Sequence, residues 1–346
     1  MQTVNLSTSS GNKSSVLISS HLSDLTRLFN ELRQSGRRVV AVTDIVVNEI
    51  YGQYFDCEKI LIHADEQHKT VDEAVRIVHE LLAINAGKEL FLIGIGGGIT
   101  TDICGFVASI FKRGVDFAFI PTTLLAMVDA SVGGKNGVNC AHFKNMLGVI
   151  RQPQWIYVNP FFLKTLPDRQ FRCGIAEMLK MFIIAEDNYR NAVSLFTDKS
   201  LAEIMDDEET KHRFILLIQS AIQIKCRFVM EDEFDTGNRR LLNLGHTFAH
   251  ALEHCTSELF HGEAVAIGMI LSAKLAQSPC VSVLKEDFIK CGLPIGIPSH
   301  LDKKKFLDAI WQDKKNEGET ITCVLLHDIK NVSVSTLDTD TLYKIL

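Results

Sequence analysis

Four histidines stand close together late in the chain, in the stretch LNLGHTFAHALEHCTSELFHGEAV. His246 and His250 are four residues apart, so on a helix they would share one face. His254 continues this spacing, and His261 follows after a short break. Imidazole nitrogens bind divalent metals and also move protons near neutral pH. The stretch alone leaves three interpretations open: a metal site, a proton-transfer site or an ordinary amphipathic helix.

A catalytic metal site of this type also needs a carboxylate, and GIAEMLK offers one in Glu177. Apolar residues surround Glu177 on a predicted helix. Burial of a carboxylate on an apolar face costs free energy unless the group is paired or bound to a cation. Lys180 is three residues further on and shares the helix face. An ion pair with Lys180 at the helix surface is therefore the alternative to a metal ligand.

A glycine-rich turn in GIGGGITTD follows an apolar strand and precedes a predicted helix. Such a turn lets the backbone approach a ligand, and the helix offers free N–H groups to an anion. The spacing is not GxGxxG, so the common dinucleotide fingerprint is not met, and a tight strand–helix turn is the alternative. Asp44 closes an earlier strand, and Glu66 and Lys69 follow another. Carboxylates at strand ends suit ribose hydroxyls.

Several cations and amides lie in polar or glycine-rich contexts, and each by itself would be an ordinary solvated side chain. Gathered at one site, they would bind a phosphorylated and carboxylated substrate. They are Arg113, Lys135 with Asp129, Lys144, Asn145, Lys225, Arg239, Asn243, Lys314 and Lys315.

The elements that must position these residues differ between the two halves of the chain. Residues 37–127 alternate apolar strand runs with helical patterns, which predicts a mostly parallel sheet with helices on its faces. The expected strands are 37–44, 59–64, 88–98 and the start of 115–127, and the expected helices are 71–85 and 99–114. From about Thr165 the pattern is helical until the strand run 321–328. The boundary is expected near residues 155–170, where Pro160 and Pro167 lie.

Composition limits the classes of function. The chain has 346 residues, which suits two domains, and its formal net charge of −6 gives no support to nucleic-acid or membrane binding. Nine scattered cysteines without a CxxC pair indicate reduced thiols in a cytoplasm. The polar N-terminus lacks the apolar core of a signal peptide, and no apolar run approaches membrane-spanning length.

Taken together, the motifs resemble the 3-dehydroquinate synthase family of sugar-phosphate cyclases over roughly residues 37–320. The matching runs, in the family's order, are GGGITTDICGF, FKRGVDF, IPTTLLAMVDASVGGKNGVN, FKNMLG, LKTLP, GIAEMLK, LLNLGHTFAH, FHGEAVAIGM and DKKNEG. The resemblance implies a Rossmann-like NAD-binding α/β domain over residues 1–160 and an all-α metal- and substrate-binding domain over residues 161–346. It also implies an active site in the cleft between the domains, and we expect a homodimer.

The resemblance carries residue roles onto matching positions. Glu177, His246 and His261 are similar to the family's ligands for Zn²⁺ (or Co²⁺), His250 to a proton-transfer or substrate-orienting residue, and His254 has no assigned role. The cofactor contacts implied are Asp44, Glu66, Lys69, Gly97, Gly98, Asp102, Thr122, Thr123, Lys135, Lys144, Phe162 and Thr165. The substrate and catalytic residues implied are Arg113, Asp129, Lys135, Asn145, Lys180, Lys225, Arg239, Asn243, His250 and Lys314. The neighbouring Lys315 is the alternative to Lys314 as the substrate contact.

The implied reaction converts 3-deoxy-D-arabino-heptulosonate 7-phosphate to 3-dehydroquinate by NAD-dependent oxidation, phosphate elimination, re-reduction and intramolecular aldol closure. Asn136 stands where the family usually has threonine, and Cys173 and Phe182 replace small residues. The segment between His250 and His261 is shortened, and the run after residue 320 lacks a late glycine. These departures leave open a paralogue that acts on a related sugar phosphate, such as an inosose- or valiolone-forming cyclase. A metal-dependent polyol dehydrogenase and a non-catalytic binding domain are two further alternatives.

Overall fold

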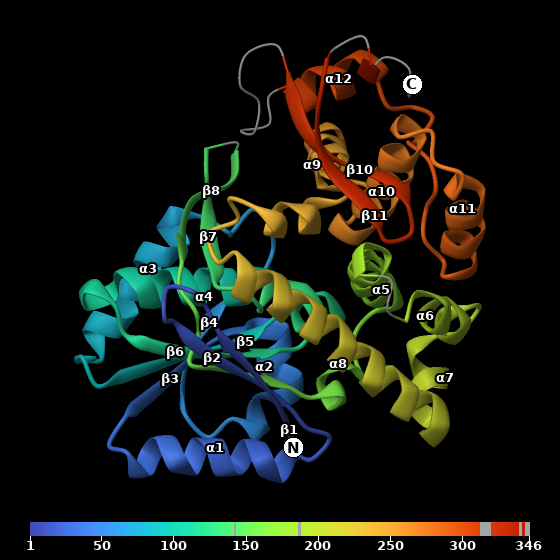
Figure 1. Cartoon of the computed structure of the whole chain (residues 1–346). Helices are drawn as coiled ribbons and strands as arrows, with labels where there is room; N and C mark the ends of the chain where they lie inside the picture. The colour runs from blue at the N-terminus through green and yellow to red at the C-terminus, as the bar shows by residue number, and fades with distance from the viewer. Residues whose placement is uncertain (142, 186–187, 312–319, 339–340, 343–346) are drawn as a thin grey trace. The chain divides into compact units, whose positions relative to one another are not determined.

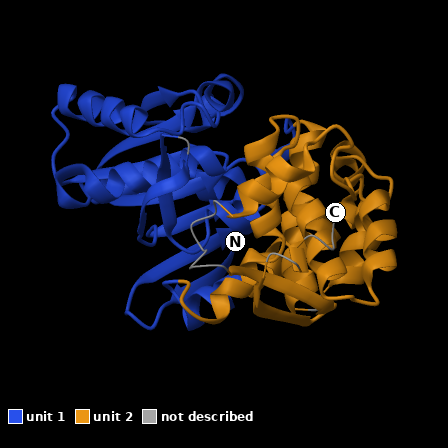
Figure 2. Ribbon diagram, turned by 90° about the horizontal axis from the view of Figure 1, so that it is seen from above, with its two compact units in different colours: residues 1–166, 225–234 blue, residues 167–224, 235–346 orange. Residues whose placement is uncertain are grey.

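A computed structural model describes residues 1–141, 143–185, 188–311, 320–338 and 341–342 of the chain (Figure 1). These residues form two compact units, shown in separate colours in Figure 2. The first unit comprises Met1–Leu166 and Lys225–Phe234, and the second comprises Pro167–Ile224 and Asp235–Leu346. Among the described residues, no helix combines the length and apolar character needed to cross a membrane.

The first unit is built on a seven-stranded sheet with the order β1-β2-β9-β6-β5-β3-β4. All neighbouring strands are parallel except β1 and β2, which form an antiparallel hairpin. The predicted mostly parallel sheet is thus confirmed, although the N-terminal hairpin carries no clear strand pattern in the sequence. The strands are β1 (Gln2–Ser7), β2 (Lys13–Ile18), β3 (Arg38–Asp44), β4 (Glu58–Ile62), β5 (Leu90–Gly96), β6 (Asp116–Pro121) and β9 (Trp155–Val158).

Helices connect the parallel strands, as the alternating sequence pattern predicts. They are α1 (Leu22–Gln34), α2 (Ile45–Tyr51), α3 (Val71–Ala83) and α4 (Gly98–Ile110), with short helical turns η1 (Gly52–Tyr54), η2 (Phe111–Arg113), η3 (Ala126–Ala130) and η4 (Pro160–Leu163). Every residue of β5 is buried, which suits a central strand with both faces covered. The glycine-rich stretch after η3 forms a hairpin of β7 (Lys135–Cys140) and β8 (Phe143–Ile150).

The second unit is mainly helical, which confirms the predicted character of the C-terminal half. Its elements are α5 (Asp168–Ala185), α6 (Tyr189–Phe196), α7 (Leu201–Asp206), α8 (Glu208–Glu231, whose last turns belong to the first unit), η5 (Asn238–Asn243), α9 (His246–Cys255), α10 (His261–Leu275), α11 (Val281–Lys290) and α12 (Lys303–Trp311). A hairpin of β10 (Ile321–Asp328) and β11 (Asn331–Leu337) adds strands to a unit that was expected to be all-α.

Two helices form the centre of the second unit. α5 and α10 are buried along most of their length, and α10 contacts α5, α9, α11 and β10. The sequence of α10, HGEAVAIGMILSAKL, is apolar nearly all round, which is typical of a helix enclosed by its neighbours. Both helices carry residues predicted to bind metal, so the buried helices at the centre of this unit also position the candidate site.

Candidate metal centre and nucleotide-binding residues

Three side chains from three helices meet in the second unit. Glu177 belongs to α5, and His246 and His261 are the first residues of α9 and α10. The Nε2 atoms of His246 and His261 lie 3.6 Å and 3.3 Å from Oε1 of Glu177. One ligand atom from each residue lies within 4.8 Å of the other two. His246 and His261 follow Glu177 by 69 and 84 residues in the sequence, yet all three side chains lie close enough to bind a single ion.

Two glycines allow the helices to approach this closely. A Cβ added to Gly262 would lie 2.3 Å from Cα of Cys173, which is one turn before Glu177 on α5. A Cβ added to Gly268 would lie 2.1 Å from the carbonyl oxygen of Gly245, the residue before His246. Backbone atoms cannot yield as a flexible side chain can. The spacing of α10 against α5 and α9 therefore depends on glycine at both positions.

The residues present fit a divalent cation. Glu177 is completely buried, and neither of its carboxylate oxygens accepts a hydrogen bond of ordinary geometry within the part of the chain that the structure describes. Nζ of Lys180 lies 2.5 Å from Oε2, outside that geometry, and both side chains are buried. The ion pair considered from the sequence therefore exists in the interior and not at the helix surface. One carboxylate and two imidazoles form the donor set of a catalytic zinc site with an open position.

The second nitrogen of each candidate ligand has its own partner. Nδ1 of His246 lies 3.2 Å from the carbonyl oxygen of Leu244, and Nδ1 of His261 lies 3.4 Å from Oε1 of Glu253. Burial lowers the pKa of His261, but the carboxylates of Glu253 and Glu177 outweigh this effect and raise it to about 10. A bound cation would replace the proton that these carboxylates otherwise stabilise.

The other two histidines of the stretch differ from this pair. The ring centroid of His250 lies 5.7 Å from that of His246 and 6.5 Å from that of His261, so His250 borders the cluster. It is half-buried, as a group that reaches a substrate must be. His254 is exposed, in agreement with its lack of an assigned role.

The expected substrate residues of this unit are the buried Lys180 and Arg239 and the half-buried Asn243, while Lys314 lies outside the described residues.

In the first unit, the glycine turn between β5 and α4 lies against the residues that follow β6. The backbone N–H of Thr122 donates to the carbonyl oxygen of Gly96 over 2.9 Å. A Cβ on Gly97 would lie 3.2 Å from Cγ2 of Thr123. Four residues predicted to contact the cofactor (Gly97, Gly98, Thr122 and Thr123) are therefore neighbours at the carboxyl ends of two adjacent strands, where ligands of open α/β sheets bind.

Lys69 connects several further predicted residues. It is buried, and its ammonium donates to Oδ2 of Asp102 over 2.5 Å and to Oδ1 of Asn145 over 2.6 Å. Burial raises the pKa of Asp102, and the neighbouring Lys69 opposes that effect. Asn139, which the sequence reading did not single out, donates to Oε1 of Glu66 over 2.8 Å and accepts from the backbone of Asn145 over 2.8 Å. Its place in GGKNGVN was the available signal.

Three of the expected cofactor contacts also stabilise the local structure of the first unit. Asp44 caps α2 by accepting from the backbone N–H groups of Val46 and Val47, and its other oxygen accepts from Ala64. The Phe162 ring is enclosed by Tyr51 and Phe55, with a centroid distance of 5.2 Å to Tyr51. The hydroxyls of Thr165 and Tyr51 lie 2.9 Å apart. These residues fix α2 directly after β3, and their cofactor roles stay predictions.

The remaining predicted residues of the first unit fall in different places. The Lys225 ammonium forms an ion pair with Asp129 and also donates to its carbonyl oxygen. Lys135 is exposed, and the turn before it is braced by Asn136, whose side chain donates to the carbonyl oxygens of Gly134 and Arg151. Lys144 is exposed and lies 3.9 Å from Glu66.

Arg113 lies apart from the glycine turn within its own unit. It is exposed and follows the C-terminal end of α4, whereas the turn precedes the N-terminal end. Since α4 has 13 residues, its ends are about 20 Å apart. The structure therefore does not bring Arg113 together with Gly97 and Gly98, and its expected substrate role stays a prediction.

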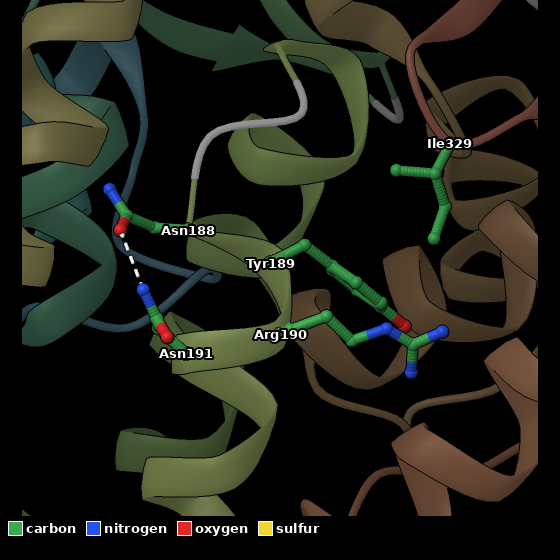
Figure 3. A pocket seen from close by; sticks show the side chains of 5 residues that line it. All are labelled: Asn188, Tyr189, Arg190, Asn191 and Ile329. Atoms are coloured by element: carbon green, nitrogen blue, oxygen red, sulfur yellow. Dashed lines mark hydrogen bonds between the residues drawn. The ribbon is translucent and has the colours of Figure 1, made fainter.

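A separate hollow of about 300 Å³ in the second unit is lined by Asn188, Tyr189, Arg190, Asn191 and Ile329 (Figure 3). The Tyr189 hydroxyl and the Arg190 guanidinium each donate to the buried carboxylate of Asp287 over 3.0 Å. None of the residues that line it was predicted to act, so the three-residue cluster and not this hollow is the candidate site.

Two solved structures have a fold closely similar to that of this chain. A 2-deoxy-scyllo-inosose synthase complexed with carbaglucose-6-phosphate, NAD⁺ and Co²⁺ is 20% identical, with a TM-score of 0.84 and coverage of 99% of both chains. A 2-epi-5-epi-valiolone synthase from Streptomyces hygroscopicus with NAD⁺ and Zn²⁺ bound is 25% identical, with a TM-score of 0.82 over 95% of this chain and 94% of that one. The fold is that of the sugar-phosphate cyclases.

The models of the 3-dehydroquinate synthase N-terminal and C-terminal domains match residues 59–173 and 174–316. The chain belongs to the 3-dehydroquinate synthase family. A 3-dehydroquinate synthase of Coxiella burnetii is 37% identical over 319 residues, covering 87% of this chain and 86% of that protein. The family consists of phosphate-eliminating lyases, which favours a cyclase over a polyol dehydrogenase or a non-catalytic domain.

Proposed function

We propose that this chain converts 3-deoxy-D-arabino-heptulosonate 7-phosphate to 3-dehydroquinate and phosphate. We further propose that Glu177, His246 and His261 hold the divalent ion and that the β5–α4 turn of the first unit receives NAD. The observation that carries the proposal is a completely buried carboxylate with two imidazole nitrogens 3.3 Å and 3.6 Å away, in a chain of this family.

When bound, zinc or cobalt supplies a Lewis acid for the substrate's C5 oxygen, and NAD supplies reversible hydride transfer at C5. Related cyclases solved with NAD⁺ and Co²⁺ or with NAD⁺ and Zn²⁺ support this cofactor set. Catalysis of the complete reaction regenerates NAD, so no net reduced cofactor accumulates.

The chain's own residues would bind the substrate and move its protons. His250 borders the metal cluster and is half-buried, which suits a group that takes up or returns a proton from a substrate oxygen. Lys180, Arg239 and Asn243 in the second unit, and Lys135, Asn145 and Lys225 in the first, would bind the phosphate and carboxylate groups. A substrate with both a phosphate and a carboxylate explains this number of cations better than the precursor of an inosose or valiolone, which has no carboxylate.

Two further expectations belong to the whole protein. We propose that it forms a homodimer and acts in the cytoplasm. All nine cysteines are free thiols, and six of them are buried, which suits a reducing compartment.

Phosphate release from the heptulosonate phosphate tests the proposed function. Release should require both NAD⁺ and a divalent metal, stop when a chelator removes the metal, and proceed without accumulation of NADH absorbance. A Glu177→Ala variant should lose bound metal and release no phosphate. Steady production of NADH from a simple polyol, without phosphate release, would instead support a dehydrogenase.

A further inference from the structure

The two candidate imidazole ligands have different outer partners. Both histidines direct Nε2 toward Glu177 and Nδ1 away from it. The Nδ1 atom of His246 meets a neutral backbone carbonyl, that of Leu244. The Nδ1 atom of His261 meets a carboxylate, that of Glu253. The two histidines therefore present the same nitrogen to the metal position, but Nδ1 of His246 faces a neutral carbonyl and Nδ1 of His261 faces a charged carboxylate.

The helix geometry places Glu253 on the side of α9 that carries His246. The two residues are seven apart, which is close to two full helical turns. The Glu253 side chain is 9% exposed, and α9 packs directly on α10, which begins at His261. A carboxylate held in this apolar contact is costly unless it has a partner. The imidazole of His261, with Nδ1 3.4 Å from Oε1 of Glu253, is one such partner.

We propose that Glu253 is a positioning residue for the metal centre. It accepts the Nδ1 hydrogen of His261, which fixes the tautomer that presents the Nε2 lone pair to the ion, and it adds a negative charge behind that ligand. This inference rests on the proposed function, because it takes the three-residue cluster to be the metal site. Outer carboxylates of this kind hold the ring orientation and raise the basicity of a histidine ligand.

The backbone carbonyl behind His246 cannot be removed by substitution, so the contribution of Glu253 is the one that mutation can isolate. Glu253→Gln keeps the shape and one oxygen acceptor but removes the charge. Glu253→Ala removes both. Glu258→Gln is the matched control, because Glu258 is a well-exposed carboxylate in the same α9–α10 connection and interacts with His300.

The test measures binding of Zn²⁺ and Co²⁺ alone to the full metal-free chain, by competition with a chromophoric chelator at one fixed pH. We expect Glu253→Gln to weaken metal binding about 10-fold and Glu253→Ala up to about 100-fold. The visible absorption of bound Co²⁺ should shift in both variants, because the field of the His261 ligand changes. Glu258→Gln should match the unaltered protein in affinity and in spectrum.

Unaltered affinity and an unaltered Co²⁺ spectrum in a folded Glu253→Gln protein would overturn the inference. If that variant does not fold, Glu253→Asp takes its place, because it keeps the charge on a shorter arm and should bind metal more weakly with a shifted spectrum. Glu177→Ala separates this inference from the proposed function. Retention of metal by Glu177→Ala would show that the cluster itself is not the metal site.

Discussion

Single residues divide the histidine stretch into different kinds of group. His246 and His261 direct a nitrogen toward the buried Glu177, His250 stands beside them, and His254 faces solvent. Sequence spacing treats the first pair of the stretch, His246 and His250, as equivalent, because four residues make about one helical turn. The packing of α5 and α10 distinguishes the two residues, because it places Glu177 and His261 next to His246 and leaves His250 at the border of the cluster.

Substitution of His250 by alanine tests this division. We expect His250→Ala to keep one equivalent of bound metal and to lower the rate of phosphate release about 10²- to 10⁴-fold, the usual contribution of a general acid or base. His261→Ala should lose both properties. Metal content by atomic emission and steady-state kinetics on the same preparations decide the matter. Loss of metal from His250→Ala would make it a ligand and change the assignment.

At the scale of elements, the close packing of α10 against α5 brings the cluster together. An alanine in place of a helical glycine usually stabilises a helix by about 0.5–1 kcal/mol. At Gly262 the added Cβ would lie 2.3 Å from backbone Cα of Cys173, so the sign should reverse. We expect Gly262→Ala to destabilise the protein by about 1–3 kcal/mol, as overpacked cores do, and to weaken metal binding.

Gly296→Ala is the control, because a Cβ at that position meets no atom within 4 Å. Its free energy of unfolding and its metal affinity should stay close to those of the unaltered chain. Urea unfolding and the chelator competition measure both quantities for the two variants. Equal behaviour of Gly262→Ala and Gly296→Ala would mean that the helix contact does not set the site.

The elements themselves were largely predictable, because their patterns are local. The buried strands of the first unit and the helices α3 and α4 follow directly from apolar runs and periodicity. The hairpin of β1 and β2 was not predicted, because its polar, serine-rich sequence resembles a loop. The resemblance to the family identified the candidate ligands, whereas the residue types alone left three interpretations of the histidine stretch open. The role of Glu253 depends on the packing of α9 against α10, which no local pattern records.

At the scale of the whole molecule, the chain returns to its first unit after building part of the second. Segment Lys225–Phe234 belongs to the first unit, as Figure 2 shows. Within it, the buried Glu233 accepts hydrogen bonds from Ser10, Asn12 and Gln152. One carboxylate thereby ties a late segment of the chain to the β1–β2 turn and to the segment before β9.

This tie should make stability depend on pH. Burial would raise the pKa of Glu233, but hydrogen bonds from Ser10, Gln152 and their neighbours outweigh it and lower the pKa. A carboxylate with a depressed folded-state pKa contributes stability above its unfolded value of about 4.3. That contribution is lost as the pH falls through the folded-state pKa. We expect Glu233→Gln to destabilise the protein by about 1.5–3 kcal/mol at pH 7.

The difference between Glu233→Gln and the unaltered protein should begin to shrink as the pH falls below the unfolded-state pKa of about 4.3, and it should be smallest below the depressed folded-state pKa, where both side chains are neutral. Urea unfolding at several pH values measures it. Glu231→Gln, at an exposed position in the same segment, should show no such dependence. A destabilisation of Glu233→Gln that is the same at every pH would point to lost shape and not to lost charge.

The central claim is that Glu177, His246 and His261 hold one divalent ion, and anomalous X-ray diffraction from zinc-loaded crystals tests it most directly. The account predicts one strong peak at the zinc absorption edge, about 2.0–2.2 Å from a Glu177 oxygen and from Nε2 of each histidine. A peak bound elsewhere on the chain, with these three side chains left without an ion, would contradict it.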